Sequence, residues 1–491
     1  MQKLLLSICT LFLLALSAHF FLYNLGQHSI SAASDEVVYV RVIQSILHQN
    51  DIFPLKHGGL PFNEKPPLKF WLTSIIPFLL GENNLSFRLF DGALGVICVA
   101  LSVLIARALF ASWIGALITG LLLLGAPEWV ISHHSFRRVV LDGLLTTLLL
   151  IASIYGWRAY SSLLRNESAL RNLVIFSLLC GLGSLTKSVA GLIPIASMAL
   201  LFMLSKQGRC TWKTSLISLS VGPLIFLTYI CVVAFQGKHA LHTFLGIEIF
   251  ERVVHGFTGH NTGDPWYYFR YIFIRGGITP VPLLLFGLAG SLYAAIKDNA
   301  FRFTIIWSFL PLGIYSLSSS KAPWYLNPYM PFFVMTAVFG TLYVIKKIPT
   351  HKVIYQFTLA AFLCLLFLPP YYRTLTHHFT SVAQQTQRLA IDVISQDISR
   401  LKTPVIFLRN SISGRASPIN GHFNVEGIYR QILKRSMRVI KQASEIIISE
   451  RQYVFLEKSQ LENLSGDWKI YKELPPFGPR KHWVVVVSYN L

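Results

Sequence analysis

Residues 86–110 read SFRLFDGALGVICVALSVLIARALF, and this stretch decides the class of fold. A helix needs about 20 predominantly apolar residues to cross the hydrocarbon core of a bilayer. The stretch supplies them and keeps its few charges near its two ends. It therefore predicts a membrane-spanning helix, and similar stretches recur on both sides of it.

The composition of the whole chain agrees with this prediction. Of its 491 residues, 53% are hydrophobic and 13% are charged, and the mean hydropathy is +0.53. An average soluble domain carries about 25% charged residues, so the deficit excludes an ordinary soluble enzyme, a disordered chain and a coiled coil. Lys and Arg total 43 against 22 acids, a net charge of +21. In a membrane protein such an excess reflects basic cytoplasmic loops, so we expect membrane lipids and no nucleic acid as partners.

Eleven candidate spans lie near residues 4–22, 86–110, 112–130, 138–160, 170–186, 188–205, 214–236, 276–296, 302–318, 323–346 and 352–371. Some are short, and the region 112–137 could be divided differently. The alternate short loops after the second, fourth, sixth, eighth and tenth spans hold twelve basic residues against two acids. The positive-inside rule places these loops in the cytoplasm. The polar regions 23–85, 237–275 and 373–491 then lie outside.

Two segments allow more than one interpretation. Residues 66–81 are apolar but short, and counting them as a span would move every later basic loop outside, so we interpret them as an interfacial or re-entrant helix. Residues 1–18 also resemble a signal peptide. We favour a retained span because the apolar run extends through residues 20–23. The predicted fold is a polytopic α-helical membrane protein with about 11–13 transmembrane helices.

The tail reads as a separate small domain. We expect a transmembrane domain over residues 1–372 and an extracytoplasmic α/β domain over 373–491. The tail has a helical pattern near 381–401 and strand-like runs at 405–409, 445–449, 453–456 and 483–488. The six cysteines show no metal-ligand spacing, so we expect neither a disulfide framework nor a zinc–thiolate site.

The first outer region holds the densest chemistry. Asp35 and Glu36 open a predicted helix with Ser34 or Asp35 as its N-cap, and acids commonly cap the first turn and stabilise the macrodipole. Glu64 and Lys65 precede two prolines, which hold this charged pair beside a segment entering the membrane surface; the alternative is a solvated turn. Arg88 begins the next span, and an arginine there could instead extend its charge toward lipid headgroups.

Three motifs in order resemble a known superfamily. They are Asp35-Glu36-x-x-Tyr39 after the first span, Glu64-Lys65-Pro66-Pro67-Leu68, and Arg88-Leu89 opening the second span. This combination resembles the lipid-carrier-dependent glycosyltransferases of the GT-C superfamily. The nearest members are bacterial 4-amino-4-deoxy-L-arabinose lipid A transferases, and protein O-mannosyltransferases are more distant. The resemblance covers most of residues 1–345, and the tail matches only in its placement.

Further motifs resemble the same superfamily. They are Arg137-Arg138-x-x-x-Asp142, Thr186-Lys187 followed by Ser188 instead of Gly, Glu248-Ile249-x-x-Arg252 with Ile in place of His, His260 before the aromatic residues 266–268, and Ser320-Lys321-x-Pro323-x-Tyr325. Each has a structural alternative. Asp142 could cap its helix or pair with Arg137 or Arg138, the lysines could reach toward headgroups, and His260 could be an ordinary loop histidine.

The resemblance implies a role for each of these positions. Asp35 would be the catalytic base or would orient the acceptor, and Asp142 would support the acceptor side. The donor phosphate would be held by Lys65, Arg252, Tyr325 and Lys321. A divalent metal, zinc or magnesium, would be bound by Glu64 and His260. The supporting residues would be Glu36, Arg88, Arg138, Lys187 and Glu248.

The implied reaction is sugar transfer from a polyprenyl-phosphate donor, with inversion, to a lipid A or glycolipid acceptor on the periplasmic face of a bacterial inner membrane. The sequence holds no phosphate-cradling Gly-rich loop, which suits a lipid-linked donor. Two alternatives are a protein O-glycosyltransferase of the same fold and a transporter or lipid flippase. A transporter favours ionisable residues near the bilayer midplane and repeated halves. The sequence leaves the sugar and the acceptor open.

Overall fold

The computed structural model describes residues 2–26, 35–130, 132, 134–256, 264–274 and 281–347, together with five strands between residues 405 and 488. The chain divides into two compact units, residues 1–25 with 39–378 and residues 26–38 with 379–491. The predicted domain boundary at residues 372 and 373 lies outside the described residues.

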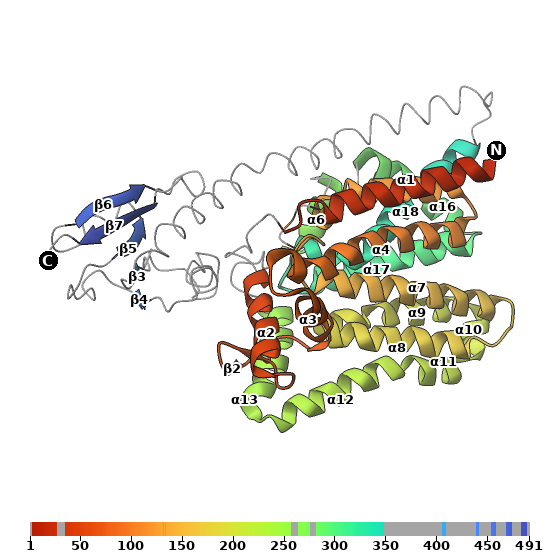
Figure 1. The fold of residues 1–491 in the computed structure, drawn as a ribbon. Coiled ribbons are helices and arrows are strands. Elements are labelled where there is room, and N and C mark those ends of the chain that lie inside the picture. The colour runs from red at the N-terminus through yellow and green to blue at the C-terminus, as the bar shows by residue number, and fades with distance from the viewer. Residues whose placement is uncertain are drawn as a thin grey trace. The chain divides into compact units, whose positions relative to one another are not determined.

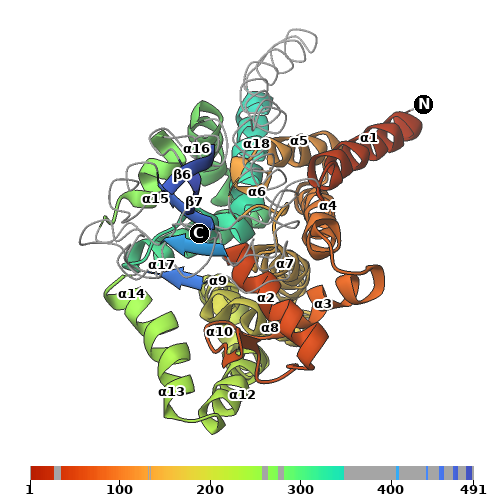
Figure 2. The same cartoon turned by 60° about the vertical axis from the view of Figure 1, so that its left-hand side comes forward.

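Long helices run side by side in the first unit (Figures 1 and 2). They are α1 (Gln2–Leu22), α4 (Asn84–Phe110), α5 (Trp113–Leu124), α7 (Asp142–Leu164), α8 (Leu170–Lys187), α9 (Ile193–Leu204), α11 (Trp212–Leu219), α12 (Val221–Phe235), α16 (Val281–Ala295), α17 (Asn299–Leu317) and α18 (Met330–Lys347). They correspond to ten of the eleven predicted spans, and the span predicted at 352–371 lies outside the described residues.

Five helical stretches among the described residues are long and apolar enough to cross a membrane. They are Asn84–Phe110, Leu170–Leu204, Trp212–Phe235, Asn299–Leu317 and Pro323–Lys347. The predicted span at 112–130 is divided into α5 and the short helix α6 (Pro127–Val130). Proline has no backbone N–H to continue a helix, which explains the break before Pro127.

Helix α3 (Leu68–Leu80) is the segment predicted to be interfacial or re-entrant. Its thirteen residues span about 20 Å at a rise of about 1.5 Å per residue, less than the roughly 30 Å of a hydrocarbon core. The prediction of a helix shorter than a span is confirmed. Helix α4 follows at once and begins with a capping box, in which Asn83 accepts from Ser86 N at 2.9 Å and Ser86 Oγ accepts from Asn83 N at 3.0 Å.

Other elements connect these helices and carry most of the motifs. They are α2 (Asp35–Gln49), β1 (Lys56–His57), β2 (Leu60–Pro61), η1 (Ser188–Leu192), α10 (Lys206–Cys210), α13 (Lys238–Leu241), the π-helix η2 (His242–Glu251), α14 (Arg252–Val254), α15 (Tyr267–Phe269), the π-helix η3 (Arg270–Ile274) and the 3-10 helix η4 (Pro323–Tyr329).

Helices α16 and α18 pack backbone against backbone through glycine. A Cβ atom added to Gly340 would lie 1.7 Å from the carbonyl oxygen of Gly287, and one added to Gly287 would lie 2.1 Å from that of Ala337. Small residues allow this close approach, which is a common way for membrane helices to associate. Many large apolar side chains face outward instead, such as Phe235, which is 92% exposed, as expected where lipid is the solvent.

The second unit contains a five-stranded mixed sheet in the order β4-β3-β5-β7-β6. The strands are β3 (Val405–Leu408), β4 (Arg438–Ile440), β5 (Tyr453–Glu457), β6 (Trp468–Glu473) and β7 (Trp483–Ser488). Strand β3 runs parallel to β4 and β5, and β7 runs antiparallel to β5 and β6. The sequence predicted β3, β5 and β7 and missed β4 and β6. The predicted helix at 381–401 and strand at 445–449 lie outside the described residues.

Candidate functional site

Glu248 lies between two cations that the sequence predicts to act on phosphate. Its Oε2 accepts a hydrogen bond from Lys65 Nζ, and its Oε1 accepts from Arg252 Nη2 at 2.8 Å. The Glu248 side chain is only 7% exposed, and Lys65 comes from a segment 183 residues away. Lys65 and Arg252 therefore share one small polar centre.

Two features fix Arg252 in this centre. The Arg252 backbone carbonyl accepts a hydrogen bond from Ser320 N at 3.0 Å, which pairs the start of α14 with the segment before η4. Its guanidinium also interacts with the phenol of Tyr325. Burial opposes the charged form, but Glu248 and Tyr325 outweigh it and raise the pKa of Arg252. The guanidinium therefore stays charged.

A second polar centre surrounds Asp142, the first residue of α7. Its Oδ1 accepts from Lys187 Nζ at 2.5 Å, and its Oδ2 lies 3.1 Å from Nδ1 of His134. The Asp142 side chain is only 4% exposed. A buried carboxylate needs such partners, since an isolated charge would be very costly there.

Aromatic residues of η4 connect the two centres. Lys187 Nζ lies 5.3 Å from the centroid of the Tyr325 ring, and His134 stacks on Trp324 with ring centroids 4.0 Å apart and an interplanar angle of 9°. Tyr325 thus contacts the cation of each centre. We call this connected set the polar cluster; it consists of Lys65, His134, Asp142, Lys187, Glu248, Arg252, Trp324 and Tyr325.

The remaining predicted residues lie near helix ends. Lys321 is 4% exposed, and its ammonium donates to the backbone carbonyl of Ser318. The side chain is therefore buried and does not extend toward lipid headgroups, which was the structural alternative. Arg88 is 3% exposed and donates to the Leu25 carbonyl at 3.2 Å. Arg138 lies in the loop before α7.

Asp142 does not pair with Arg137, which was one of the alternatives that the sequence left open. Arg137 donates to the backbone carbonyls of Phe20 and Tyr23, at 2.6 and 2.9 Å. Carbonyls at a helix C-terminus carry partial negative charge, so Arg137 and Arg88 both stabilise the end of α1. Lys187 provides the cation for Asp142 instead.

The predicted base opens its own helix. Asp35 is the first residue of α2, and the following Glu36 has a fully buried side chain. Asp35 therefore lies at the start of a helix, as the sequence predicted. This position is compatible both with capping of the helix and with catalysis. Ser34, the other predicted cap, lies outside the described residues.

His134 and Glu128 were not predicted from the sequence. His134 precedes Asp142 by eight residues, and the pair could have been noted as an imidazole and a carboxylate flanking two arginines. Glu128 Oε1 accepts from the Tyr271 hydroxyl at 3.0 Å, and its Oε2 is buried without a hydrogen-bond partner among the described residues. Both carboxylates lie close enough to His134 to interact electrostatically.

The predicted metal site has one described ligand. Glu64 lies in the turn before α3, whereas His260 lies outside the described residues. Among the residues that the structure describes, no three His, Cys, Asp or Glu side chains gather to hold a metal ion. The described donor set therefore does not fit a metal by itself.

Sequence matches to known proteins agree with the resemblance that the motifs carry. Residues 64–235 match the family of dolichyl-phosphate-mannose-protein mannosyltransferases. The undecaprenyl phosphate-alpha-4-amino-4-deoxy-L-arabinose arabinosyl transferase of Erwinia tasmaniensis is 23% identical over 312 residues, covering 62% of this chain and 55% of that protein. A second such transferase, of Pseudomonas fluorescens, is 26% identical over 313 residues, covering 63% and 55%. The chain thus spans just over half the length of these curated relatives.

Solved structures extend the similarity to the whole fold. The crystal structure of ArnT from Cupriavidus metallidurans bound to undecaprenyl phosphate superposes with a TM-score of 0.67 at 15% identity, covering 97% of each chain. Its apo form gives 0.64 with the same coverage. With its apolar helices, the chain is a multi-pass membrane protein. The resemblance seen in the motifs is confirmed: this chain is similar in sequence to the arabinosyl transferases and has the GT-C fold that it shares with ArnT.

Proposed function

We propose that the chain is an integral-membrane glycosyltransferase that moves a sugar from a polyprenyl-phosphate donor to a lipid A or glycolipid acceptor. One observation carries the proposal, namely that three distant segments bring Lys65 and Arg252 together on Glu248 and Tyr325 against Arg252 in the polar cluster. Two cations and a phenol together are suited to a phosphate group. The names of the relatives support a polyprenyl-phosphate donor.

In the proposed reaction, the acceptor attacks the anomeric carbon while the bond to the lipid phosphate breaks. Lys65 and Arg252 stabilise the charge that develops on the departing phosphate, and Tyr325 donates to it. Lys321 assists less directly, since its ammonium already binds backbone. Attack from the face opposite the phosphate inverts the anomeric configuration.

Asp35 is proposed to take the acceptor proton or to orient the acceptor, and Asp142 to support the acceptor side. Lys187 and His134 hold the Asp142 carboxylate in one orientation, which is the preorganisation that such a role needs. Glu248 keeps both phosphate-binding cations in place before the donor arrives. Glu36, Arg88 and Arg138 are proposed as supporting residues. Glu64 and His260 remain proposed ligands of a divalent metal, and no step described above depends on one.

The proposed location is a bacterial inner membrane with the polar cluster and the tail on the periplasmic side. The basic residues of the alternate loops support this orientation. A lipid-linked donor suits that side because the lipid carrier can present its phosphate at the membrane surface, where the outer loops lie.

A protein acceptor is the second candidate, because the matched family is named for protein mannosyltransferases. Mass spectrometry of lipid A, glycolipids and glycoproteins from a deletion strain separates the candidates. We expect one glycolipid to lose a sugar and to regain it when the wild-type gene, but not an Arg252→Ala variant, is supplied. Loss of a protein glycan instead would identify the second candidate. Unchanged glycans together with altered solute uptake would contradict both and favour a transporter.

A further inference from the structure

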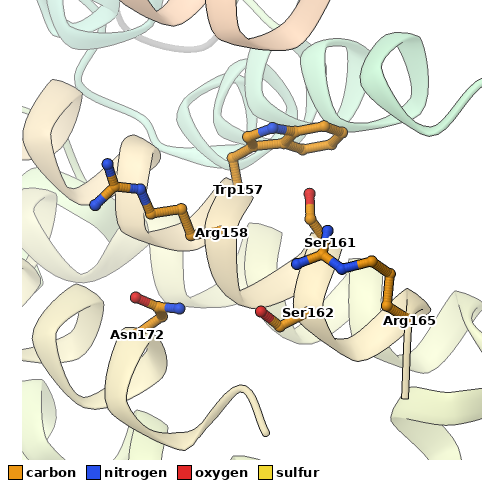
Figure 3. A pocket seen from close by; sticks show the side chains of 6 residues that line it. All are labelled: Trp157, Arg158, Ser161, Ser162, Arg165 and Asn172. Atoms are coloured by element: carbon orange, nitrogen blue, oxygen red, sulfur yellow. The ribbon is translucent and has the colours of Figure 1, made fainter. Parts of the chain in front are cut away.

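A polar pocket lies at the end of α7 that is remote from Asp142. It is lined by Trp157, Arg158, Ser161, Ser162, Arg165 and Asn172, and its cavity measures about 390 Å³. Five of these residues come from α7 and the residue after it, and Asn172 comes from α8 (Figure 3). We call it the α7–α8 pocket.

The pocket lies near the opposite boundary of the membrane from the polar cluster. Arg158 follows Asp142 by four and a half helical turns, about 24 Å at a rise of about 1.5 Å per residue. That distance approaches the roughly 30 Å thickness of a hydrocarbon core. The pocket therefore plays no part in binding the donor at Arg252, and it lies among the basic short loops.

Most of the polar side chains in the pocket lack partners. Within the described part of the chain, the side chains of Arg158, Ser161, Ser162 and Asn172 form no hydrogen bond; Arg158 only lies 5.5 Å above the ring of Tyr155. Together they offer one guanidinium, two hydroxyls and an amide to a ligand. This set of donors fits the oxygens of a phosphate group.

The charge of the pocket fits an anion with a single charge. Arg165 is already paired with Glu167 through two hydrogen bonds of 2.8 and 3.0 Å. Arg158 therefore supplies the net positive charge. Helix α8 starts beside Asn172 without a capping side chain on Ala169, so its first backbone N–H groups add to the positive potential. A phosphodiester carries one negative charge and would neutralise this site.

We propose that the α7–α8 pocket binds the phosphate group of an anionic phospholipid. Basic pockets between transmembrane helices are known to hold such headgroups on the side that carries the basic loops. Trp157 lines the opposite side of the opening from Ser162 and Asn172 (Figure 3), and an indole in this position suits the membrane–water interface. The same donors would take free phosphate, so the experiment compares the two sources.

The experiment uses the full chain in nanodiscs of phosphatidylcholine containing a minor fraction of phosphatidylglycerol, and native mass spectrometry counts the retained phosphatidylglycerol. We expect Arg158→Gln to reduce retention about tenfold, since it removes a charge-assisted hydrogen bond to the phosphate. Arg171→Gln is the matched control, because Arg171 is exposed in the first turn of α8 but does not line the pocket. It should retain the lipid as wild type does.

Equal loss in the two variants, or no retention by wild type, would overturn the proposal, because general surface charge would then explain any binding. A second arm adds inorganic phosphate to nanodiscs of pure phosphatidylcholine and records the thermal midpoint. Stabilisation by inorganic phosphate that Arg158→Gln abolishes, without lipid retention, would assign the site to soluble phosphate and overturn the lipid. Lipid retention without that stabilisation supports the headgroup.

Discussion

Arg252 is the residue through which the phosphate proposal can be tested most sharply. It meets Glu248 and Tyr325 with a planar fork of donors, and lysine would keep the charge but lose the fork. We expect Arg252→Lys to raise the KM for a polyprenyl-phosphate sugar about tenfold, the effect of losing one charge-assisted hydrogen bond. Initial rates in detergent or nanodiscs measure this change.

The control for that substitution is Arg270→Lys. Arg270 pairs with Asp264, is 53% exposed and lies outside the polar cluster. It should leave the KM for the donor unchanged. An unchanged KM in Arg252→Lys as well would remove Arg252 from the donor site.

The buried pair of Asp142 and Lys187 makes a prediction about stability. Removing one member leaves the other charge buried, whereas removing both does not. We expect Asp142→Asn to lower the free energy of unfolding more than the double variant Asp142→Asn/Lys187→Met does, with a coupling of about 1–3 kcal/mol. Thermal unfolding in detergent measures the cycle. The pair of Arg165 and Glu167 is more than half exposed, so the same cycle there should show much weaker coupling.

At the scale of residues, sequence patterns pointed to several charged residues but not to the partners that the structure gives them. The motifs that resemble the GT-C superfamily named Lys65, Arg252 and Asp142, and for Asp142 the cost of an acid at the end of a span added a physical argument. Their pairing depends on contacts across long separations: Lys187 lies 45 residues after Asp142. No local periodicity encodes such a contact, and for this reason His134 was missed and Arg137 was offered as a partner for Asp142.

At the scale of elements, the contact between α16 and α18 depends on the absence of a side chain at Gly340. A Cβ there would lie 1.7 Å from a backbone oxygen that cannot move independently of α16. We expect Gly340→Ala to lower the free energy of unfolding by about 1–3 kcal/mol through overpacking. Gly313→Ala in α17 is the control, since nothing lies within 4 Å of its added Cβ, and there alanine should be neutral or stabilising by about 0.5–1 kcal/mol. Equal thermal midpoints for the two variants would contradict this account of the packing.

The hairpin of β1 and β2 carries a pH-sensitive group, His57. Burial, together with the nearby Arg41 cation, lowers the pKa of His57, and its Nε2 is buried without a hydrogen-bond partner among the described residues. The folded protein then holds fewer protons than the unfolded chain, so stability falls as the pH drops below the unfolded pKa of about 6.5. We expect the thermal midpoint to fall between pH 7.5 and pH 5.5, and His57→Gln to remove part of that fall. A wild-type-like pH profile in His57→Gln would exclude this role.

Element boundaries were predictable where apolar length sets them and less so where proline does. The spans at 86–110 and 302–318 correspond closely to α4 and α17, because a long apolar run is sufficient to specify a helix in a bilayer. The span at 112–130 lies in a region whose division the sequence left open, and the structure divides it before Pro127. In the tail, β4 and β6 were missed because a strand is specified by its neighbours in the sheet as much as by its own residues.

At the scale of the whole molecule, the proposed function depends on orientation. The polar cluster and the α7–α8 pocket lie at opposite ends of α7. The excess of basic residues in alternate loops predicts which end faces the cytoplasm. Only an outward-facing polar cluster lets its residues meet a donor on the periplasmic side. A topology measurement is therefore a test of the mechanism as well as of the fold.

A native cysteine allows that measurement. Cys210 is exposed in α10, within a loop predicted to be cytoplasmic, and Leu60 is 71% exposed on β2, in the first outer region. In sealed spheroplasts, a membrane-impermeant maleimide should label a Leu60→Cys variant at once, and Cys210 only after permeabilisation; Cys210→Ser should remove the later signal. Cys9 and Cys231 are exposed on apolar helices, where an apolar environment disfavours the reactive thiolate, so they should contribute little. Labelling of Cys210 in sealed spheroplasts would reverse the orientation, put Lys65 and Arg252 on the cytoplasmic face, and contradict transfer on the periplasmic side.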